Sequence, residues 1–440
     1  MPENEEGPSE SSSSEPSSPV ESSVQKIRSF GGVFSKVSLW GECHLGCPVW
    51  SVSVSRSGIL CGCDDGSIVL LNCNMDCGFR VQEAHRSAIT QITWASDGLH
   101  FLTVGTDLHV RVWRMLTETA ECIYSMHQIS PVISACFHPM TYGASPTGLQ
   151  GSPRSMSNDV PSPGVMSVCT VFVLTSDKKI GVWTDGVVEM YESLSAKDAM
   201  PMSMSAQLRP VFATASTSSA VSSRGHPTYL AIGAKNGDLL LYSFSSDSGI
   251  SYESSIACHN RRGKYRDGAP AIGVQWISGS ELVLSTQDNR IRLVRINSNW
   301  SGSGLKNPIK MTVVKKFKGH RSSGGEVPLA GFVHSAPFAK PVLIVGSECG
   351  RVFAWPLDPQ GLSETKVESS SSILSKLWNN VRTSRARSST DTWVAVQGPD
   401  KLTAVAPAPW IPQKGRIAGA SCTVTASLDG SVKLFLAEFS

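Results

Sequence analysis

The chain has no run of about 18 uninterrupted apolar residues, which excludes a segment of that kind spanning a bilayer. Its N-terminus has neither a basic start nor an apolar run, so we expect no signal peptide. Charged residues make up only 17%, and a formal net charge of +3 is too small to indicate nucleic-acid binding. We therefore expect a cytoplasmic protein without a nucleic-acid partner.

The spacings of a nucleophile elbow, a phosphate-binding loop and a zinc metalloprotease are also missing. The glycine-rich stretch Ser301–Gly304 lacks the residue order of a phosphate-binding loop and precedes no predicted helix. We expect no enzymatic activity, no catalytic residue and no cofactor.

Twelve cysteines occur without a secretory signal, which indicates reduced thiols. A zinc site would need paired ligands that converge on one point. The cysteines of the N-terminal cluster lie at spacings inside predicted strands and turns, where we expect their side chains to diverge. We therefore expect small core-filling side chains and no metal at this cluster, which contains Cys43, His44, Cys47, Cys61, Cys63, Cys73 and Cys77.

One short phrase recurs seven times: a turn residue, two variable residues, then alternating apolar residues that end in a bulky one. A turn residue followed by such alternation predicts a hairpin that enters a half-buried strand. Repetition of the unit indicates a stack of sheets, none of which can bury its faces alone. The copies are Asp65–Leu71, Asp107–Trp113, Asp177–Trp183, Asn236–Tyr242, Asp288–Val294, Cys349–Trp355 and Asp429–Phe435.

Two further signals accompany the phrase. Apolar strands precede it, as in Ile89–Trp94, Phe101–Gly105 and Val342–Gly346, and histidines open several repeats, namely His44, His85, His127 and His320. A histidine at the start and a tryptophan at the end is the WD-repeat pattern. The sequence predicts an all-β, seven-bladed WD-repeat β-propeller over residues 32–440. An eighth blade in the longest interval is an alternative, although no phrase marks it.

Segments outside the repeats differ in composition. We expect residues 1–31 to be a disordered, acidic, Ser-rich tail, and residues 141–163, 196–224 and 358–398 to be inserted loops rich in Ser, Pro or Gly. Ser152 and Ser162, each followed by proline, are predicted phosphorylation sites. The last blade would lack an outer strand after 431–435, and residues 32–40 are well placed to supply it.

The turn residues have two interpretations. Asp65, Asp107, Asp177, Asn236, Asp288, Cys349 and Asp429 could hold tight turns through hydrogen bonds to backbone amides, or the carboxylates among them could do chemistry. Scattered copies cannot form a catalytic pair, so we expect a structural role.

A basic stretch follows the predicted strand before the fifth phrase. It is either a solvated loop or a docking surface for an anionic partner, which would be an acidic protein face or phospholipid headgroups. The candidate contacts are Arg261, Arg262, Lys264, Arg266, Lys316, Lys318 and Arg321. Residues 373–381 have the periodicity of a short amphipathic helix that would cap the rim or engage a membrane.

In its linkers as well as its repeats, the chain resembles the WD-repeat proteins of vesicle trafficking that act as Rab GTPase effectors at recycling endosomes. The segments that carry the resemblance are His44–Val54, His127–Pro139, His259–Val274, Leu284–Leu293, Lys316–His320, Gly346–Glu348 with Val352–Trp355, and Val381–Trp393. In that family the Rab-binding segment lies in a long N-terminal region, where this chain has a short acidic tail.

The resemblance implies a non-catalytic scaffold or adaptor in endomembrane traffic, peripheral on endosomal or Golgi membranes, with protein partners that include a Rab-type GTPase. We expect a monomer within a larger complex. Two alternatives stay open: a phosphoinositide-binding propeller that uses the Arg261–Arg266 edge, and a substrate-receptor scaffold of a larger complex.

Overall fold

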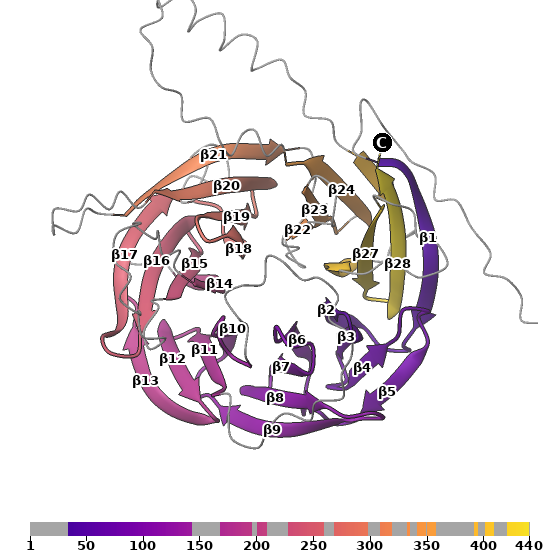
Figure 1. Cartoon of the computed structure of the whole chain (residues 1–440), viewed down its shortest axis with the longest axis horizontal. Helices are drawn as coiled ribbons and strands as arrows, with labels where there is room; N and C mark the ends of the chain where they lie inside the picture. The colour runs from indigo at the N-terminus through magenta and orange to yellow at the C-terminus, as the bar shows by residue number, and fades with distance from the viewer. Residues whose placement is uncertain are drawn as a thin grey trace, which may run out of the picture.

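The strands of the chain form a ring of antiparallel sheets, and this confirms the all-β propeller that the sequence predicts (Figure 1). Every regular element in the described part of the chain is a β-strand. The computed structural model describes residues 34–142, 168–195, 200–208, 228–258, 268–297, 309–318, 332–334, 341–348, 350–357, 391–394, 401–408 and 420–439. Within these residues no helix is long and apolar enough to cross a membrane.

Each sheet has four strands. In six sheets they run from the axis to the rim in chain order, whereas the seventh takes its rim strand from the N-terminal end of the described chain. Blade 1 consists of β2 (Val49–Ser55), β3 (Gly58–Cys63), β4 (Ile68–Leu71) and β5 (Cys77–Val81). Blade 2 consists of β6 (Ile89–Trp94), β7 (His100–Gly105), β8 (His109–Met115) and β9 (Ala120–His127). Blade 3 consists of β10 (Val132–Phe137), β11 (Thr170–Thr175), β12 (Lys179–Thr184) and β13 (Val187–Ser193).

The sheets continue around the ring in the same order. Blade 4 consists of β14 (Pro201–Leu208), β15 (Thr228–Ala234), β16 (Asp238–Ser245) and β17 (Gly249–Ala257). Blade 5 consists of β18 (Ala271–Ser278), β19 (Glu281–Thr286), β20 (Arg290–Asn297) and β21 (Lys310–Lys318). Blade 6 consists of β22 (Phe332–His334), β23 (Val342–Gly346), β24 (Arg351–Pro356) and β25 (Asp391–Val394). Blade 7 consists of β26 (Leu402–Ala408), β27 (Ala420–Ser427), β28 (Ser431–Phe439) and β1 (Phe34–His44).

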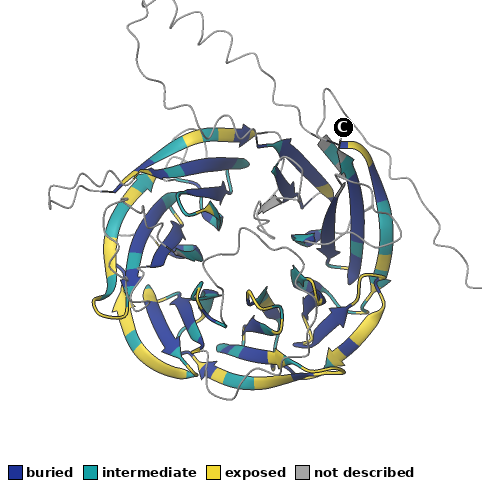
Figure 2. Ribbon diagram, viewed as in Figure 1, coloured by how far each residue is buried: buried dark blue, intermediate teal, exposed yellow. Residues whose placement is uncertain are grey.

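The core lies between the blades. The second strands β3 and β15 are buried along their whole length, whereas the rim strand β13 is mostly exposed (Figure 2). Seven apolar clusters of described residues each join two neighbouring blades, and together they follow the ring without a break. No sheet therefore buries its faces alone, as the repeated phrase predicts.

Ring closure by the N-terminal strand is confirmed. β1 pairs antiparallel with β28, from Phe34 opposite Phe439 to His44 opposite Ser431, so it extends beyond the predicted residues 32–40. Phe34 and Val37 are buried in the cluster that also contains Val342 of blade 6 and Phe435 of blade 7. The first described strand therefore covers the edge of the last blade.

The predicted boundaries of the inserted loops are wrong at three places. Pro201–Leu208, inside predicted loop 196–224, is the innermost strand of blade 4, and Asp391–Val394, inside predicted loop 358–398, is the rim strand of blade 6. Thr141, at the start of predicted loop 141–163, is buried and donates its hydroxyl to the Thr170 carbonyl at 3.0 Å. The serines that suggested a loop suit a strand at the crowded axis, where Ser203 donates to the Ala271 carbonyl at 3.0 Å. Apart from Tyr142 and Met200, the rest of these loops lies outside the described residues, as do the tail 1–31 and the helix 373–381.

Candidate functional site

The seven phrases form the same turn between the second and third strands of each blade. The residue after the turn residue is left-handed in every copy, with φ of 77° at Gly66, 64° at Leu108, 63° at Lys178, 83° at Gly237, 56° at Asn289, 76° at Gly350 and 84° at Gly430. Because the strands are antiparallel, the connections between blades leave from the same side of the ring as these turns. We call this side the turn face.

The turn side chains mostly accept hydrogen bonds from their own turn. Asp65 and Asp429 each accept the amide N–H two residues on at 2.9 Å, and Asn236 and Asp107 accept theirs at 3.1 and 3.2 Å. Asp177 and Asp288 accept the hydroxyls of Thr175 and Thr286 at 2.6 and 2.5 Å. Cys349 lies outside the described residues. Each of the six described turn residues belongs to a different blade.

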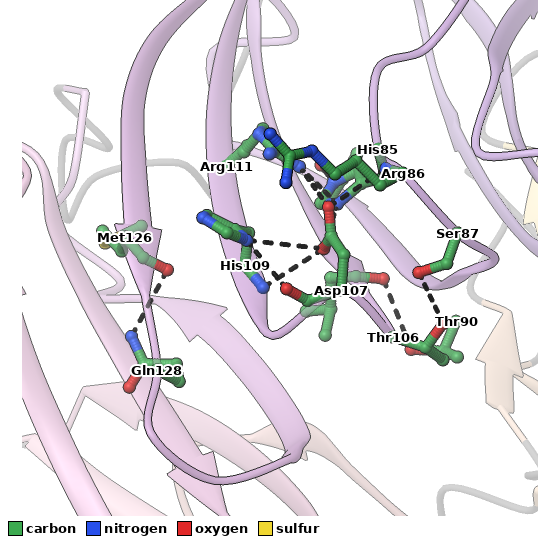
Figure 3. A network of polar contacts seen from close by, with 12 residues as sticks. His85, Arg86, Ser87, Thr90, Thr106, Asp107, His109, Arg111, Met126 and Gln128 are labelled. Carbon is green, nitrogen blue, oxygen red and sulfur yellow. Dashed lines mark hydrogen bonds and ion pairs between the residues drawn. The ribbon is translucent and has the colours of Figure 1, made fainter.

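Blade 2 extends its turn into a buried network (Figure 3). His85 Nδ1 lies 2.8 Å from Asp107 Oδ1, and His85 Nε2 lies 2.7 Å from the Thr103 hydroxyl. That hydroxyl also accepts the indole N–H of Trp113 at 2.9 Å. Arg111 donates to Asp107 Oδ2 at 3.0 Å. The network joins the connection from blade 1, the turn and two strands of blade 2.

The network sets the charges of its members. Burial lowers the pKa of His85 and outweighs the attraction of Asp107. Burial alone would raise the pKa of Asp107, but hydrogen bonds from His85 and Arg111 and from the Arg86 amide hold that pKa well below its usual range. At neutral pH the site therefore holds a neutral imidazole beside an ionised carboxylate.

The other described histidines that open repeats make different contacts. His44 Nδ1 accepts the Gly46 amide at 3.3 Å, and the exposed His127 lies 4.9 Å from the His109 ring, measured between centroids. His320 lies outside the described residues. In blade 3, Val173 stands where blade 2 has Thr103, and the buried Trp183 indole N–H has no hydrogen-bond partner among the described residues. The sequence pattern therefore recurs in other blades, but the described histidines that open them do not form the hydrogen-bond network of blade 2.

Sequence reasoning missed the arginines at the turns. Arg111 and Arg292 each lie four residues after a turn aspartate, and this spacing was a usable signal. Arg292 is 1% exposed and donates to Asp288 Oδ2 at 2.9 Å and to the Thr286 hydroxyl. In blade 1 the partner comes from the rim strand, where Arg80 donates to Asp65 Oδ2 at 2.6 Å.

Two of the predicted anionic-partner contacts lie together at blade 5. Lys316 and Lys318 are exposed on β21, where Lys318 stands opposite Arg290 at the turn-face end of the sheet. Lys315 Nζ lies 5.1 Å from the centroid of the Phe317 ring. Arg261, Arg262, Lys264, Arg266 and Arg321 lie outside the described residues.

The chain around blade 5 has a net positive charge, whereas the rest of the chain has a net negative charge. Cys258, before the basic stretch, donates its amide to the Gly237 carbonyl at 3.1 Å, and Gly268, after it, packs against Asn236. Both ends of the stretch therefore lie at the blade 4 turn. Residues 258–331 contain thirteen Lys and Arg against four Asp and Glu, whereas the rest of the chain has 26 against 32. The small net charge hides a strongly basic sector.

A cavity of about 570 Å³ lies on the axis of the ring. Its described lining consists of apolar side chains, hydroxyls and amides, without a titratable group. The residues are Val52, Ser53, Val54, Thr90, Gln91, Ile92, Thr93, Ile133, Ser134, Met202, Ser203, Ile272, Gly273, Val274, Gln275, Val405, Ala406 and Pro407. This lining can bind through hydrogen bonds but offers no acid, base or nucleophilic thiol.

The expected divergence of the cysteine cluster is wrong for one pair. The Sγ atoms of Cys47 and Cys63 and a carboxylate oxygen of Asp65 all lie within 4.8 Å of one another. The backbone explains why: Asp64 donates its amide to the Pro48 carbonyl at 2.9 Å, which brings the connection before β2 against the end of β3. These atoms are of types that bind thiophilic metals. However, the guanidinium of Arg80 already contacts Asp65 and Cys47.

No protein-family model matches this chain, and no curated protein shows significant sequence similarity to it.

Proposed function

We propose that this protein is a non-catalytic WD-repeat scaffold that docks an anionic protein partner on the turn face of blade 5, in endomembrane or vesicle traffic. The observation that carries the proposal is the basic sector of blade 5 on a closed ring. Lys316 and Lys318 are exposed there and form no ion pair with other described residues. Such cations favour encounter with a negatively charged surface.

The blade 2 network supports the WD-repeat part of the proposal. The repeat pattern places a histidine near the start of a unit and a tryptophan near its end. Here His85 and Trp113 meet through the Thr103 hydroxyl, and His85 also meets the turn residue Asp107. The common turn conformation in all seven phrases supports it as well.

The axial cavity supports a role without catalysis. A general acid or base has to lie within hydrogen-bond reach of the reacting group. The described lining offers only hydroxyls, amides and apolar groups to a ligand in the cavity. We therefore place function on the outer surface of the ring.

The strands that precede the Ser-rich segments end on the side opposite the turn face. The chain enters these segments after β10, β14 and β24, whose ends point away from the turn face because the strands are antiparallel. We propose that the turn face binds the partner, while the Ser-Pro sites at Ser152 and Ser162 alter charge near the opposite face.

The trafficking role rests on the resemblance of the linkers to Rab-effector WD-repeat proteins, and it includes a small GTPase among the proposed partners. Proximity labelling with the full chain in living cells tests it. The labelled set should be rich in membrane-traffic proteins and should shrink when Lys316→Glu and Lys318→Glu are combined. The matched control combines Lys36→Glu and Arg56→Glu, two exposed cations away from blade 5. The proposal is contradicted if the labelled set contains no membrane-traffic proteins. It is also contradicted if the set is the same for the wild type and for the Lys316→Glu/Lys318→Glu chain.

The basic sector also favours a second function, direct binding to phosphoinositide membranes, because each basic residue near an anionic surface contributes about 1 kcal/mol. Flotation with vesicles that contain phosphoinositides tests this function. Recovery should fall for a chain that carries Arg261→Glu, Arg262→Glu and Lys264→Glu, and it should not fall for the Lys36/Arg56 control. Equal recovery of the wild type, the Arg261/Arg262/Lys264 variant and the Lys36/Arg56 control rules out the lipid function.

A further inference from the structure

Cys47 and Cys63 are two thiols with different environments held close together. Their Sγ atoms lie within 4.8 Å of each other, although one belongs to the connection between β1 and β2 and the other to the end of β3. Cys63 is fully buried, and Cys47 is half-buried. A small oxidant can therefore reach Cys47 first, and a second thiol waits beside it.

Arg80 gives Cys47 a cationic neighbour. Its Nη2 atom lies 3.5 Å from Cys47 Sγ and 2.6 Å from Asp65 Oδ2. A guanidinium beside a thiol favours the thiolate, which is the reactive form. The carboxylate of Asp65 opposes this effect, but it also accepts the amide and hydroxyl of Ser67 at 2.9 and 2.6 Å. Those bonds, together with Arg80, disperse its charge.

Cys63 is suited to the other role. Burial, together with the neighbouring Cys47, raises the pKa of the Cys63 thiol to about 12, so this thiol is protonated and does not react first with peroxide. One accessible thiol beside a cation and one protected thiol within reach is the arrangement of reacting and resolving cysteines in redox-sensitive pairs.

We propose that Cys47 and Cys63 form a peroxide-reactive thiol pair that closes to a disulfide. The Cys47 thiolate attacks one oxygen of hydrogen peroxide, the O–O bond breaks, and the leaving hydroxide takes up a proton to become water. The resulting sulfenic acid is attacked by the sulfur of Cys63, which loses its proton as the second water leaves. The thiol pair loses two electrons, and the peroxide gains them.

The disulfide would tie together the parts of the chain that close the ring. Leu45 donates its amide to the Gly430 carbonyl at 3.0 Å, and Gly430 packs against the Cys47 carbonyl. Cys47 is therefore attached to the turn of blade 7, whereas Cys63 belongs to blade 1. Oxidation should raise the midpoint temperature of unfolding, because the cross-link restricts the unfolded chain.

Limited oxidation of the full, reduced chain with hydrogen peroxide tests the pair. Remaining thiols are alkylated, and the peptides are mapped by mass spectrometry. We expect a peptide pair that joins Cys47 to Cys63 and the loss of two alkylation sites. Cys63→Ser should leave a sulfenic acid on Cys47 that a dimedone probe captures, and Cys47→Ser should abolish both products.

The rate of Cys47 oxidation in Arg80 variants tests the role of the guanidinium. Arg80→Gln should slow the oxidation of Cys47, because the variant lacks the cation that lies 3.5 Å from the Cys47 sulfur. Arg80→Lys keeps the charge and should keep most of the rate, and circular dichroism checks that each variant is folded. The matched thiol is Cys122, which is exposed and has Arg111 as an electrostatic neighbour. Cys47 reacting no faster than Cys122, or a link between Cys43 and Cys77 in place of the proposed one, overturns the proposal.

Discussion

Nδ1 of His85 lies 2.8 Å from Oδ1 of Asp107, although His85 belongs to the connection that leaves blade 1 and Asp107 to a turn inside blade 2. Both side chains are almost fully buried, at 0% and 6% exposure. The contact therefore fixes one blade against the next with polar groups that water does not reach. Removal of one partner would take a hydrogen bond away from a buried polar group, and this loss should destabilise the folded chain.

The first prediction concerns this contact. His85→Ala removes one buried hydrogen-bond partner from the Thr103 hydroxyl and one from the Asp107 carboxylate, so the free energy of unfolding should fall by about 1–3 kcal/mol. Urea unfolding measures the change. The control is Arg114→Ala, which breaks an exposed ion pair with Glu121 and should cost less than about 1 kcal/mol. Equal losses in the two variants would show that the network does not stabilise the ring.

The second prediction concerns the pH dependence of stability. His138 Nδ1 accepts the Met140 amide at 3.2 Å, so Nε2 carries the proton that points to the Thr228 hydroxyl at 2.7 Å. Burial lowers the pKa of His138 from 6.5 to about 4. Between these values the unfolded chain binds a proton that the folded chain does not, so stability is lost as the pH falls from 6.5 towards 4.

The loss from His138 should reach ~3 kcal/mol below pH 4. His138→Gln keeps a side-chain amide near Thr228 but cannot titrate. The difference in unfolding free energy between the wild type and this variant, measured from pH 7 to pH 4, should change in favour of the variant as the pH falls. A constant difference across this range contradicts the assignment of the neutral ring.

The fold was accessible from sequence because its signal is local and repeated. A turn residue and alternating apolar residues recur in each blade, and ring closure followed from counting strands. β14 was missed for a physical reason: an innermost strand needs small side chains near the axis, and its serines resemble those of a loop. Composition alone cannot separate the two cases.

The candidate site was harder to predict from the sequence than the fold, because it depends on contacts between side chains that only the folded chain brings together. His44, His85 and His127 all open repeats. Among these described histidines, only His85 contacts both a hydroxyl and a carboxylate. Arg80 reaches Asp65 from a strand that lies fifteen residues away in the sequence. Cys47 and Cys63 lie close together because the Asp64 amide donates a hydrogen bond to the Pro48 carbonyl. The sequence spacing of metal ligands does not predict this contact.

The third prediction exploits the common turn. Lys178 adopts a left-handed conformation with φ of 63°, where glycine carries no steric penalty. Lys178→Gly should therefore leave stability unchanged or raise it by up to about 1 kcal/mol. The reciprocal change Gly430→Lys should destabilise the protein, because φ there is 84° and a Cβ would lie 2.6 Å from the Cys47 carbonyl oxygen. Thermal unfolding of both variants provides the comparison, and a stabilised Gly430→Lys chain would contradict the turn assignment.

The fourth prediction concerns ring closure. Phe34 is fully buried between blades 6 and 7, so Phe34→Ala should lower the free energy of unfolding by about 3–5 kcal/mol. Deletion of residues 1–44 removes β1 and exposes the edge of β28, so this chain should unfold at a lower temperature and self-associate. Deletion of residues 1–33 keeps β1 and is the matched control. Size-exclusion chromatography with thermal unfolding separates the two deletions: a monomer of undiminished stability after loss of residues 1–44 would mean that β1 does not close the ring.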